Sequence, residues 1–421
     1  MTDADEIAKT GLYIHIPFCV KKCNYCAFLS FEADSAAKWE YTQALINEIN
    51  AAAKAYAPED GSKRHIDTVY IGGGTPTVLD VSMLSLVMTA VRSAFDVDSN
   101  AEITLEANPG TLGTSDSLTR AKLMAYKFAG VNRLSFGVQS MDNDRLNYLG
   151  RIHTAEDVVR DIELARKSGF NNINLDIIFS VPGETTEDAL EDARKIIELG
   201  PEHISCYSMQ LEEGTPFYEM AERGELHEVD DEEDRMTYHR LCDLLEESGY
   251  ERYEISNFAR EGRMSRHNSS YWNMSQYIGT GLGASSFMNG VRYRNTPDME
   301  KYLEIFGGEA QDISAGEARK KIEGAAEEWH ENTPFDNASE AVFTGLRRRE
   351  GITYEEVLSA YGEDAACAPE EVESRFWEVF PDAREEALDY RDRGLLIIDD
   401  TGMRLTREGI DISNSIMSLF V

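Results

Sequence analysis

The sequence predicts an α/β fold with a partial (β/α)6 barrel and a smaller α+β domain towards its C-terminus. Strand-like apolar runs recur six times, each followed by a stretch with helical periodicity, which is the pattern of a parallel sheet. The runs are 12–16, 68–72, 102–107, 133–139, 172–179 and 203–211. At 421 residues, the chain also exceeds what one hydrophobic core usually holds, so a second domain is expected.

Alternate residues of a strand lie on opposite faces, and the runs separate into an apolar and a polar face. The apolar face consists of Leu12, Ile14, Ile16, Val69, Ile71, Ile103, Leu105, Leu134, Phe136, Val138, Ile173, Leu175, Ile177 and Phe179. The polar face consists of Tyr13, His15, Gly72, Thr104, Glu106, Ser135, Gln139, Asn172, Asn174 and Asp176. Because closed eight-stranded barrels have an apolar interior, a polar interior predicts a more open barrel that holds a ligand.

Helices are expected between the strands, where apolar residues recur at intervals of three and four. The clearest are 35–56, 81–95, 155–169 and 186–200. The last two end in Gly169 and Gly200, which suit the left-handed backbone of a helix C-cap.

The chain is expected to divide into three parts. Residues 1–295 hold the barrel and an aromatic, glycine-rich extension, 296–334 form an acidic helical connector, and 335–421 form a winged-helix-like domain. In that domain, helices at 339–349, 353–362 and 383–394 precede two short strands joined by the turn 399–402, and a closing helix follows. The domain is acidic and has no lysine, so packing against the barrel mouth is favoured over DNA binding.

A formal charge of −36 argues against partners that are polyanions, so neither nucleic acid nor an anionic membrane is expected to bind. The run 347–349 of three arginines is a local exception, and we expect it on the solvated face of a helix. The absence of a long apolar stretch and of a signal-peptide pattern predicts a cytoplasmic protein. Cys206, Cys242 and Cys367 lack pairable spacing and are expected as buried small hydrophobes.

Three cysteines with the spacing CxxxCxxC follow the first strand. Cys19, Cys23 and Cys26 are close enough to bind one centre, and thiolate is the ligand that iron–sulfur clusters and zinc select. A structural zinc site would need a fourth Cys or His nearby, and none follows before His65. A [4Fe-4S] cluster with three cysteines leaves one iron open to a small ligand. The motif therefore favours a cluster over zinc or uncommitted thiols.

The segment GGGTPT, Gly72 to Thr77, ends the second strand, where barrel folds place their chemistry. Its glycines let backbone amides approach a ligand closely. A tight turn between strand and helix is the alternative, and it would be preferred if the cysteines were absent.

Four polar side chains are expected at the same level of successive strands, namely Glu106, Gln139, Asp176 and Gln210. Carboxylates there can bind ribose hydroxyls and offset a sulfonium charge, and Arg151 can grip an amino-acid carboxylate in bidentate fashion. Each residue alone is more often a structural polar group, and only the shared position favours the binding role.

The cysteine and glycine motifs resemble those of the radical S-adenosylmethionine (SAM) superfamily, in which the open iron takes the amino and carboxylate groups of SAM. The segments YIHIPFC, CNYCAF, GGGTPT, EANP, GVQS, 176–184 and HNSSYW at 267–272 further resemble the anaerobic coproporphyrinogen III oxidase family, and within it the HemW-type heme chaperones. The likeness runs from about residue 11 to the C-terminus, apart from an acidic segment near 307–333.

The resemblance implies which residues bind the cofactors. Cys19, Cys23 and Cys26 would bind a [4Fe-4S] cluster. The SAM site would be lined by Tyr13, Tyr25, Gly73, Gly74, Thr75, Glu106, Gln139, Arg151, Asp176 and Gln210. Heme is the expected cargo, and no catalytic residue is assigned.

Two departures from the oxidases of this family favour the chaperone branch. Phe28 stands at the last position of the oxidase pattern CxxxCxxCxC, and only 18 residues precede Cys19. The prediction is a heme chaperone that serves an acceptor protein, membrane-bound ones included, with an electron donor for its cluster. A radical SAM oxidoreductase acting on a tetrapyrrole is the alternative, and an interaction protein with a vestigial cluster site is a third class. Whether SAM is cleaved stays open.

The aromatic segment 266–295 suggests a binding surface, and His267 is its one histidine. Imidazole is a common axial ligand of heme iron, and Tyr271, Trp272 and Tyr277 can stack on a flat macrocycle. A single histidine among aromatic residues is more often a hydrogen-bonded structural residue. Both roles of His267 are open at this point.

Overall fold

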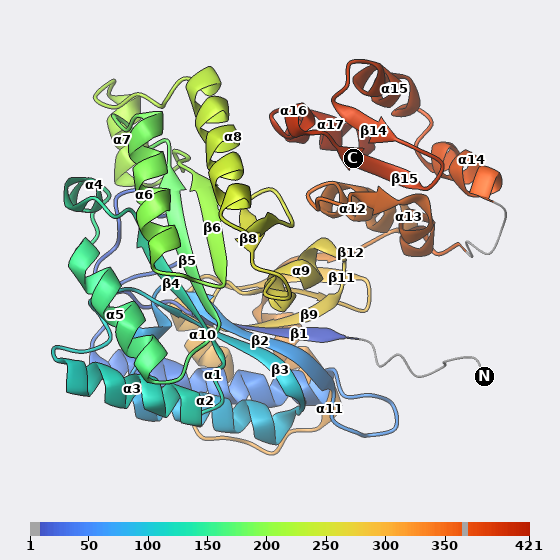
Figure 1. The fold of residues 1–421 in the computed structure, drawn as a ribbon. Helices are drawn as coiled ribbons and strands as arrows, with labels where there is room; N and C mark the ends of the chain where they lie inside the picture. The colour runs from blue at the N-terminus through green and yellow to red at the C-terminus, as the bar shows by residue number, and fades with distance from the viewer. Residues whose placement is uncertain (1–8, 364–368) are drawn as a thin grey trace.

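The computed structural model describes residues 9–363 and 369–421. Its centre is a set of six parallel strands that lie side by side in sequence order (Figure 1). They are β1 (Thr10–Ile16), β2 (His65–Gly73), β3 (Asp96–Ala107), β4 (Arg133–Gln139), β5 (Ile173–Phe179) and β6 (His203–Ser208). Each strand pairs in parallel with the next, as Leu12 does with Val69. The predicted series of six β/α units is confirmed.

Helices between the strands cover the apolar face of this sheet (Figure 1). They are α1 (Ser35–Ala55), α2 (Val81–Ala94), α3 (Asp116–Phe128), α5 (Ala155–Lys167), α6 (Thr186–Glu198) and, after β6, α8 (Asp231–Glu247). Two shorter helices, α4 (Asn143–Tyr148) and α7 (Pro216–Glu222), contribute no side chain to this core, and Phe217 of α7 belongs to a separate small cluster. Helices α5 and α6 begin in capping boxes at Thr154 and Thr185. Gly169 and Gly200 follow their ends with φ of 89° and 62°, as the sequence predicts.

The two faces of the strands are confirmed. Every residue predicted for the apolar face is at most 3% exposed, and these residues share one core with α1 and α2. Burying one such side chain stabilises the fold by roughly 1.5–3 kcal/mol.

The predicted common level of four polar residues is wrong. Strand β6 ends at Ser208, so Gln210 lies beyond it and is exposed. Asp176 pairs with Gly137 rather than with Gln139, because the β4–β5 register shifts between these two residues. The backbone of Gln139 is left-handed, with φ of 69°, and this change of direction ends β4.

The sheet continues beyond both edges of the six strands. Beside β1 lie β9 (Gln276–Thr280), β10 (Ser285–Met288), β11 (Val291–Asn295) and β12 (Ala326–Glu331), and beside β6 lie β8 (Asn257–Ala259) and β7 (Glu251–Arg252). Strand β9 is parallel to β1, and the others pair antiparallel. Helix α9 (Arg266–Trp272) precedes β9 and packs against β2.

Segment 296–334 is not a connector, contrary to the prediction. It contains α10 (Met299–Phe306), α11 (Ala315–Ala325) and β12, and its buried side chains belong to the same core as those of α1. Glu48 of α1 accepts hydrogen bonds from Gly281 N, Asn295 Nδ2 and the Tyr302 hydroxyl. These bonds fasten α1 to α10 and to the second half of the aromatic extension, at Gly281 and Asn295.

The C-terminal domain has a core of its own. Its elements are α12 (Pro334–Gly345), β13 (Ile352–Thr353), α13 (Tyr354–Tyr361), α14 (Pro369–Val379), α15 (Arg384–Asp392), β14 (Leu396–Ile398), β15 (Gly402–Leu405), α16 (Arg407–Ile410) and α17 (Ser413–Met417). Strands β14 and β15 form the predicted hairpin, and β13 adds a third strand. Helix α14 is not predicted from the sequence, because glutamates surround its buried Phe376 and Trp377.

The three arginines at 347–349 join the two domains, so their predicted place on a solvated helix face is wrong. Helix α12 ends at Gly345, just before them. The Arg347 guanidinium lies 4.6 Å from the centre of the Trp272 ring and pairs with the fully buried Glu254. The other contacts are Arg348 with Asn273 at 2.7 Å and Arg349 with Glu251 at 2.8 Å.

Two of the remaining cysteines are buried free thiols, as predicted, namely Cys206 and Cys242. Cys367 lies outside the described residues. Among the helices that the structure describes, none is long and apolar enough to cross a membrane.

Candidate cluster and cofactor site

The three motif cysteines lie on a loop that leaves the carboxyl end of β1. All three are free thiols of intermediate exposure. Backbone hydrogen bonds hold the loop, from Cys19 N to Phe31 O, from Asn24 N to Leu149 O and from Cys26 N to Cys23 O. The cysteines therefore lie at the edge of the sheet where parallel α/β folds bind their ligands.

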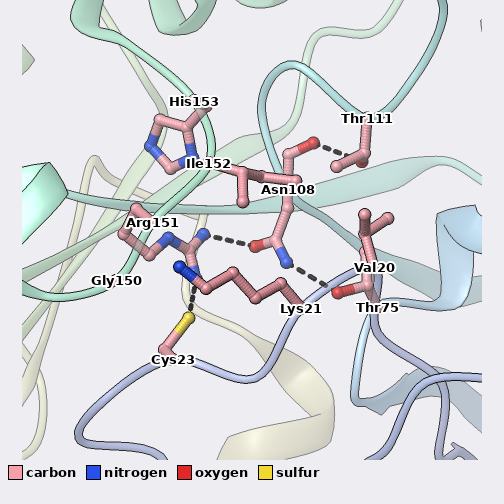
Figure 2. A pocket seen from close by; sticks show the side chains of 10 residues that line it. All are labelled: Val20, Lys21, Cys23, Thr75, Asn108, Thr111, Gly150, Arg151, Ile152 and His153. Carbon is pink, nitrogen blue, oxygen red and sulfur yellow. Dashed lines mark hydrogen bonds between the residues drawn. The ribbon is translucent and has the colours of Figure 1, made fainter.

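The surroundings of the loop suit a negatively charged sulfur centre. Arg151 Nη1 lies 3.5 Å from Cys23 Sγ (Figure 2), and Thr75 Oγ1 lies 3.6 Å from Cys19 Sγ. Both groups can donate hydrogen bonds to thiolates. Burial raises the pKa of Cys26, so that thiol stays protonated until a metal displaces the proton.

The donor set of the loop suits a cluster with one open iron. It consists of three thiols, and no further Cys or His follows before His65. A structural zinc site normally has four such ligands, whereas a [4Fe-4S] cluster can be held by three thiolates with one iron left for a small ligand. The three-cysteine loop with its neighbouring donors therefore fits the cluster.

Arg151 connects the cysteine loop to the loops that follow other strands. Its Nη2 donates to Asn108 Oδ1 at 2.6 Å, and Asn108 Nδ2 donates to Thr75 Oγ1 at 2.6 Å (Figure 2). Burial lowers the pKa of Arg151, but the neighbouring Tyr25 and Cys23 outweigh burial and raise it. Arg151 is therefore a fixed cation beside the cysteines, able to bind a carboxylate.

The glycines after β2 are packed against other parts of the protein. A Cβ on Gly73, whose φ is 112°, would lie 2.5 Å from the His15 ring, and one on Gly74 would lie 2.7 Å from a backbone oxygen. Gly73 N donates to Glu106 Oε2 at 2.9 Å. The turn itself thus requires glycine, and it delivers Thr75 to the cysteine loop.

The barrel interior holds two half-buried carboxylates, Glu106 and Asp176. Glu106 accepts a hydrogen bond from the Tyr70 hydroxyl at 2.7 Å, and burial raises its pKa to about 7. Asp176 accepts one from Asn174 Nδ2 at 2.7 Å, and burial raises its pKa as well. Arg133 is only 1% exposed, and its charge partly opposes both shifts. A cationic ligand entering here would favour the charged form of each carboxylate.

Gln139 and Arg151 come together, whereas Gln210 does not join them. A Cβ placed on Gly137 would meet Asn108, Gln139 and Arg151 within 3.2 Å. These three polar side chains therefore gather around one backbone position next to the cysteine loop. Gln210 is exposed beyond β6.

The two predicted tyrosines occupy different surroundings. Tyr13 stacks on Tyr70 with ring centres 6.2 Å apart, and its hydroxyl lies 2.9 Å from His15 Nδ1. Tyr25, from the cysteine loop, packs against a small apolar cluster that includes Phe217. Tyr13 therefore belongs to the barrel interior, and Tyr25 helps to seat the loop.

His267 is buried, and both of its ring nitrogens are engaged. Nδ1 lies 2.8 Å from Thr68 Oγ1, and Nε2 lies 2.8 Å from the Tyr271 hydroxyl. Burial lowers the pKa of His267 to about 3, so the ring is neutral. Trp272 is covered on one face by Arg347. This geometry is that of the hydrogen-bonded structural role, and ligation of iron would require Nε2 to leave Tyr271.

Three residues that link the predicted ones are not predicted from the sequence, namely Tyr70, Asn108 and Arg133. The signal that could have found them is the period of two along each strand. Tyr70 lies two residues before Gly72, Asn108 two after Glu106, and Arg133 two before Ser135.

The chain is similar to known proteins over nearly its whole length. The radical SAM superfamily model matches residues 13–196, and the HemN C-terminal domain model matches residues 332–412. The heme chaperone HemW of Bacillus subtilis is 34% identical over 97% of this chain and 98% of its own length. The chain belongs to the HemW family.

Other relatives extend this result. HemW of Escherichia coli is 38% identical over 66% of this chain and 70% of that protein. The mitochondrial radical S-adenosyl methionine domain-containing protein 1 of Danio rerio is 31% identical over 97% and 86%. Membership of the radical SAM superfamily implies a [4Fe-4S] cluster and SAM for the HemW family.

The fold of this HemW family member is that of a solved structure. Coproporphyrinogen III oxidase (HemN) from Escherichia coli, described as a radical SAM enzyme, matches 98% of this chain and 90% of its own. The TM-score is 0.78 at 22% identity, and at this identity the likeness shows the fold alone. The α/β radical SAM fold predicted from the sequence is confirmed.

Proposed function

We propose that this HemW family member is a heme chaperone, which binds heme and passes it to an acceptor protein. The observation that carries the proposal is the alignment, over nearly the whole of both chains, with proteins named heme chaperones. Phe28 supports it, because this 71% exposed side chain stands where the related oxidases have a fourth cysteine.

We assign the three loop cysteines Cys19, Cys23 and Cys26 to a [4Fe-4S] cluster with one iron left for exchangeable SAM. Arg151 would bind the carboxylate of SAM, and Glu106 in its charged form would face the sulfonium. The other residues proposed for the SAM site are Tyr13, Tyr25, Gly73, Gly74, Thr75, Gln139 and Asp176. A bound cluster would supply one-electron chemistry, which requires an electron donor.

We place the candidate heme site at α9, with His267, Tyr271 and Trp272. A neutral imidazole is the form that binds iron, and His267 is neutral, but its Nε2 is free only after the bond to Tyr271 breaks. Tyr271→Phe should therefore preserve or strengthen heme binding, and His267→Ala should remove an axial-ligand signature from the heme spectrum. An unchanged heme spectrum in the His267→Ala variant would show that His267 does not bind the iron and has a structural role.

A radical SAM oxidoreductase acting on a tetrapyrrole is the second candidate. The polar barrel interior with Glu106 and Asp176 favours it, because these residues retain what SAM binding needs in the same fold as HemN. Phe28 argues against it, since it takes the place of the last cysteine in the oxidase pattern CxxxCxxCxC.

Anaerobically reconstituted protein distinguishes the two candidates. It is incubated with reductant, SAM and either heme or coproporphyrinogen III, while heme absorbance, 5′-deoxyadenosine and porphyrin products are followed. Tight heme binding without decarboxylation supports the chaperone. Decarboxylation in step with 5′-deoxyadenosine overturns it and makes the protein an oxidase.

The proposal includes a reducing compartment and particular partners. Free thiols on an open loop suit the cytoplasm, where they stay reduced. The partners are a heme-accepting protein, membrane-bound ones included, and the electron donor. The charge of −36 disfavours nucleic acid.

A further inference from the structure

We propose that Arg145 is a positioning residue, which fixes the cysteine loop and Arg151 relative to each other through helix α4. The inference rests on the proposed cluster site and adds to it a residue from outside the loop. It is built from three sets of contacts, which run from the loop to α4, from α4 to Arg151, and from α4 to α6.

The first set joins the cysteine loop to the end of α4. Asn24 lies between Cys23 and Cys26, and its backbone N donates to Leu149 O at 3.0 Å. Its side-chain Nδ2 donates to Tyr148 O at 2.8 Å. Asn24 thus donates to two successive carbonyls, that of the last residue of α4 and that of its C-cap Leu149. A shift of this helix would therefore move the loop between the second and third cysteine.

The second set joins the same helix end to Arg151. Arg151 N donates to Leu146 O at 2.9 Å. Gly150, with φ of 78°, makes the turn, and a Cβ there would lie 3.1 Å from Asn24. One short helix end therefore positions both Cys23, through Asn24, and the guanidinium 3.5 Å from its sulfur.

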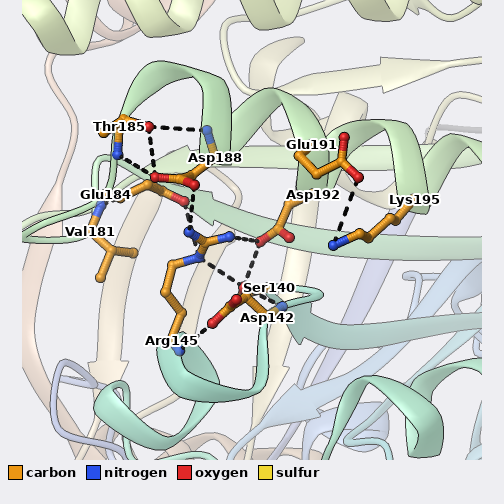
Figure 3. Close-up of polar contacts among 10 residues, drawn as sticks. All are labelled: Ser140, Asp142, Arg145, Val181, Glu184, Thr185, Asp188, Glu191, Asp192 and Lys195. Atoms are coloured by element: carbon orange, nitrogen blue, oxygen red, sulfur yellow. Dashed lines mark hydrogen bonds and ion pairs between the residues drawn. The ribbon is translucent and has the colours of Figure 1, made fainter.

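The third set anchors α4 to α6, as Figure 3 shows. Arg145 pairs with Glu184 at 3.4 Å, with Asp192 at 3.2 Å and with Asp188 at 3.9 Å. The Glu184 and Asp192 side chains are 2% and 4% exposed. Arg145 Nε also lies 3.2 Å from Ser140 Oγ.

Helix α4 needs this anchor because it is only six residues long. Isolated helices of that length are not stable in water, so tertiary contacts decide the position of α4. Removing the guanidinium would leave two buried carboxylates without their cation, which is strongly unfavourable. The structure around α4 would then rearrange, and the order at Asn24 would be lost with it.

The test uses the metal-free protein, in which thiol reactivity reports the order of the loop. Iodoacetamide alkylation of each cysteine is followed by mass spectrometry in wild type and Arg145→Met. We expect Cys23 and Cys26, which flank Asn24, to react several-fold faster in the variant, while buried Cys206 does not change. Arg145→Lys should restore part of the protection, because lysine keeps the charge.

Arg166→Met is the matched control. Arg166 pairs with Glu202 at 2.9 Å, at the opposite end of the strands from the cysteine loop. It should lower stability without changing the reactivity of Cys23. Should Arg145→Met fail to fold, Asp192→Asn removes one partner of Arg145 and leaves the cation in place. Equal Cys23 rates in wild type and in the Arg145 and Asp192 variants would overturn the proposal.

A second readout uses the reconstituted protein. Arg145→Met should alter the electron paramagnetic resonance spectrum of the reduced cluster and its response to SAM, which loss of global stability alone would not do. An unaltered spectrum and response would count against a positioning role. If wild type binds no cluster, the proposed cluster site fails, whereas the thiol measurement still decides whether Arg145 orders the loop.

Discussion

Glu48→Gln tests how the first domain is held together. Glu48 is fully buried, and its carboxylate joins α1 to the extension and to α10 through Gly281, Asn295 and Tyr302. Burial raises the pKa of this carboxyl from 4.5 to about 7, against the effect of its hydrogen bonds. The folded protein therefore holds a proton that the unfolded chain releases.

The sign and size of the effect follow from linkage. Because the pKa is higher in the folded state, the stabilisation from this proton is fully present below the unfolded value of 4.5 and is lost as the pH rises through about 7. With these two values, lowering the pH from 8 to 6 should raise the free energy of unfolding by about 1.3 kcal/mol. Glutamine does not titrate, so Glu48→Gln should lack this increment.

The assay compares wild type and Glu48→Gln by urea denaturation at pH 6 and pH 8. Hydrogen exchange of peptides from α1 reports the first domain separately, since two domains need not unfold as one. Glu40→Gln is the control, because Glu40 is exposed on the same helix. Identical pH dependence in wild type and Glu48→Gln would refute the account of Glu48 as a buried, proton-holding group.

Three further predictions concern the site and the domain interface. Glu106→Gln should weaken SAM binding more at pH 8 than at pH 6, because the wild-type carboxyl is mostly charged only above about 7; equal losses in equilibrium dialysis would contradict this. Arg151→Lys should weaken SAM binding by roughly tenfold, since lysine lacks the guanidinium fork. An unchanged affinity for SAM, measured by calorimetry, would argue against a contact between Arg151 and the SAM carboxylate. Arg347→Ala should uncover Trp272, leave the buried Glu254 unpaired and destabilise the interface by about 3 kcal/mol; unchanged proteolytic resistance between the domains would rule this out.

The barrel was predictable because one local signal determines it. The alternation of polar and apolar residues in 102–107 or 173–179 depends on each strand alone, and burial of Ile103 and Ile173 follows from it. The cysteine spacing is local in the same sense. A sequence motif and a strand end were enough to place the cysteine loop.

The incorrect predictions concern residues whose position depends on contacts with distant parts of the chain. Gln139 does not pair with Asp176 because the register between β4 and β5 shifts. No residue type in either strand predicts this shift. The acidic surface of 296–334 hides the buried Tyr302 and Phe306, whose partners lie on α1. The arginines at 347–349 meet Glu254 and Trp272 only after the two domains dock.

In the candidate site, too, local features are predictable from the sequence and long-range contacts are not. The spacing places Cys19, Cys23 and Cys26, but not the contact of Arg151 with Cys23, which spans 128 positions. The engagement of His267 with Thr68 spans 199 positions and depends on how α9 packs against β2. Long-range packing therefore decides which of two chemically reasonable roles a residue has.

The most direct measurement of chaperone function is the transfer of heme to an acceptor protein. Heme-loaded, cluster-reconstituted protein is mixed anaerobically with a heme-free acceptor protein in the presence of SAM and reductant, and acceptor absorbance is followed against a free-heme control. The account predicts that heme leaves this protein and fills the acceptor without any change to the tetrapyrrole. Heme that stays bound, or that reaches the acceptor no faster than free heme, would contradict the assignment as a heme chaperone.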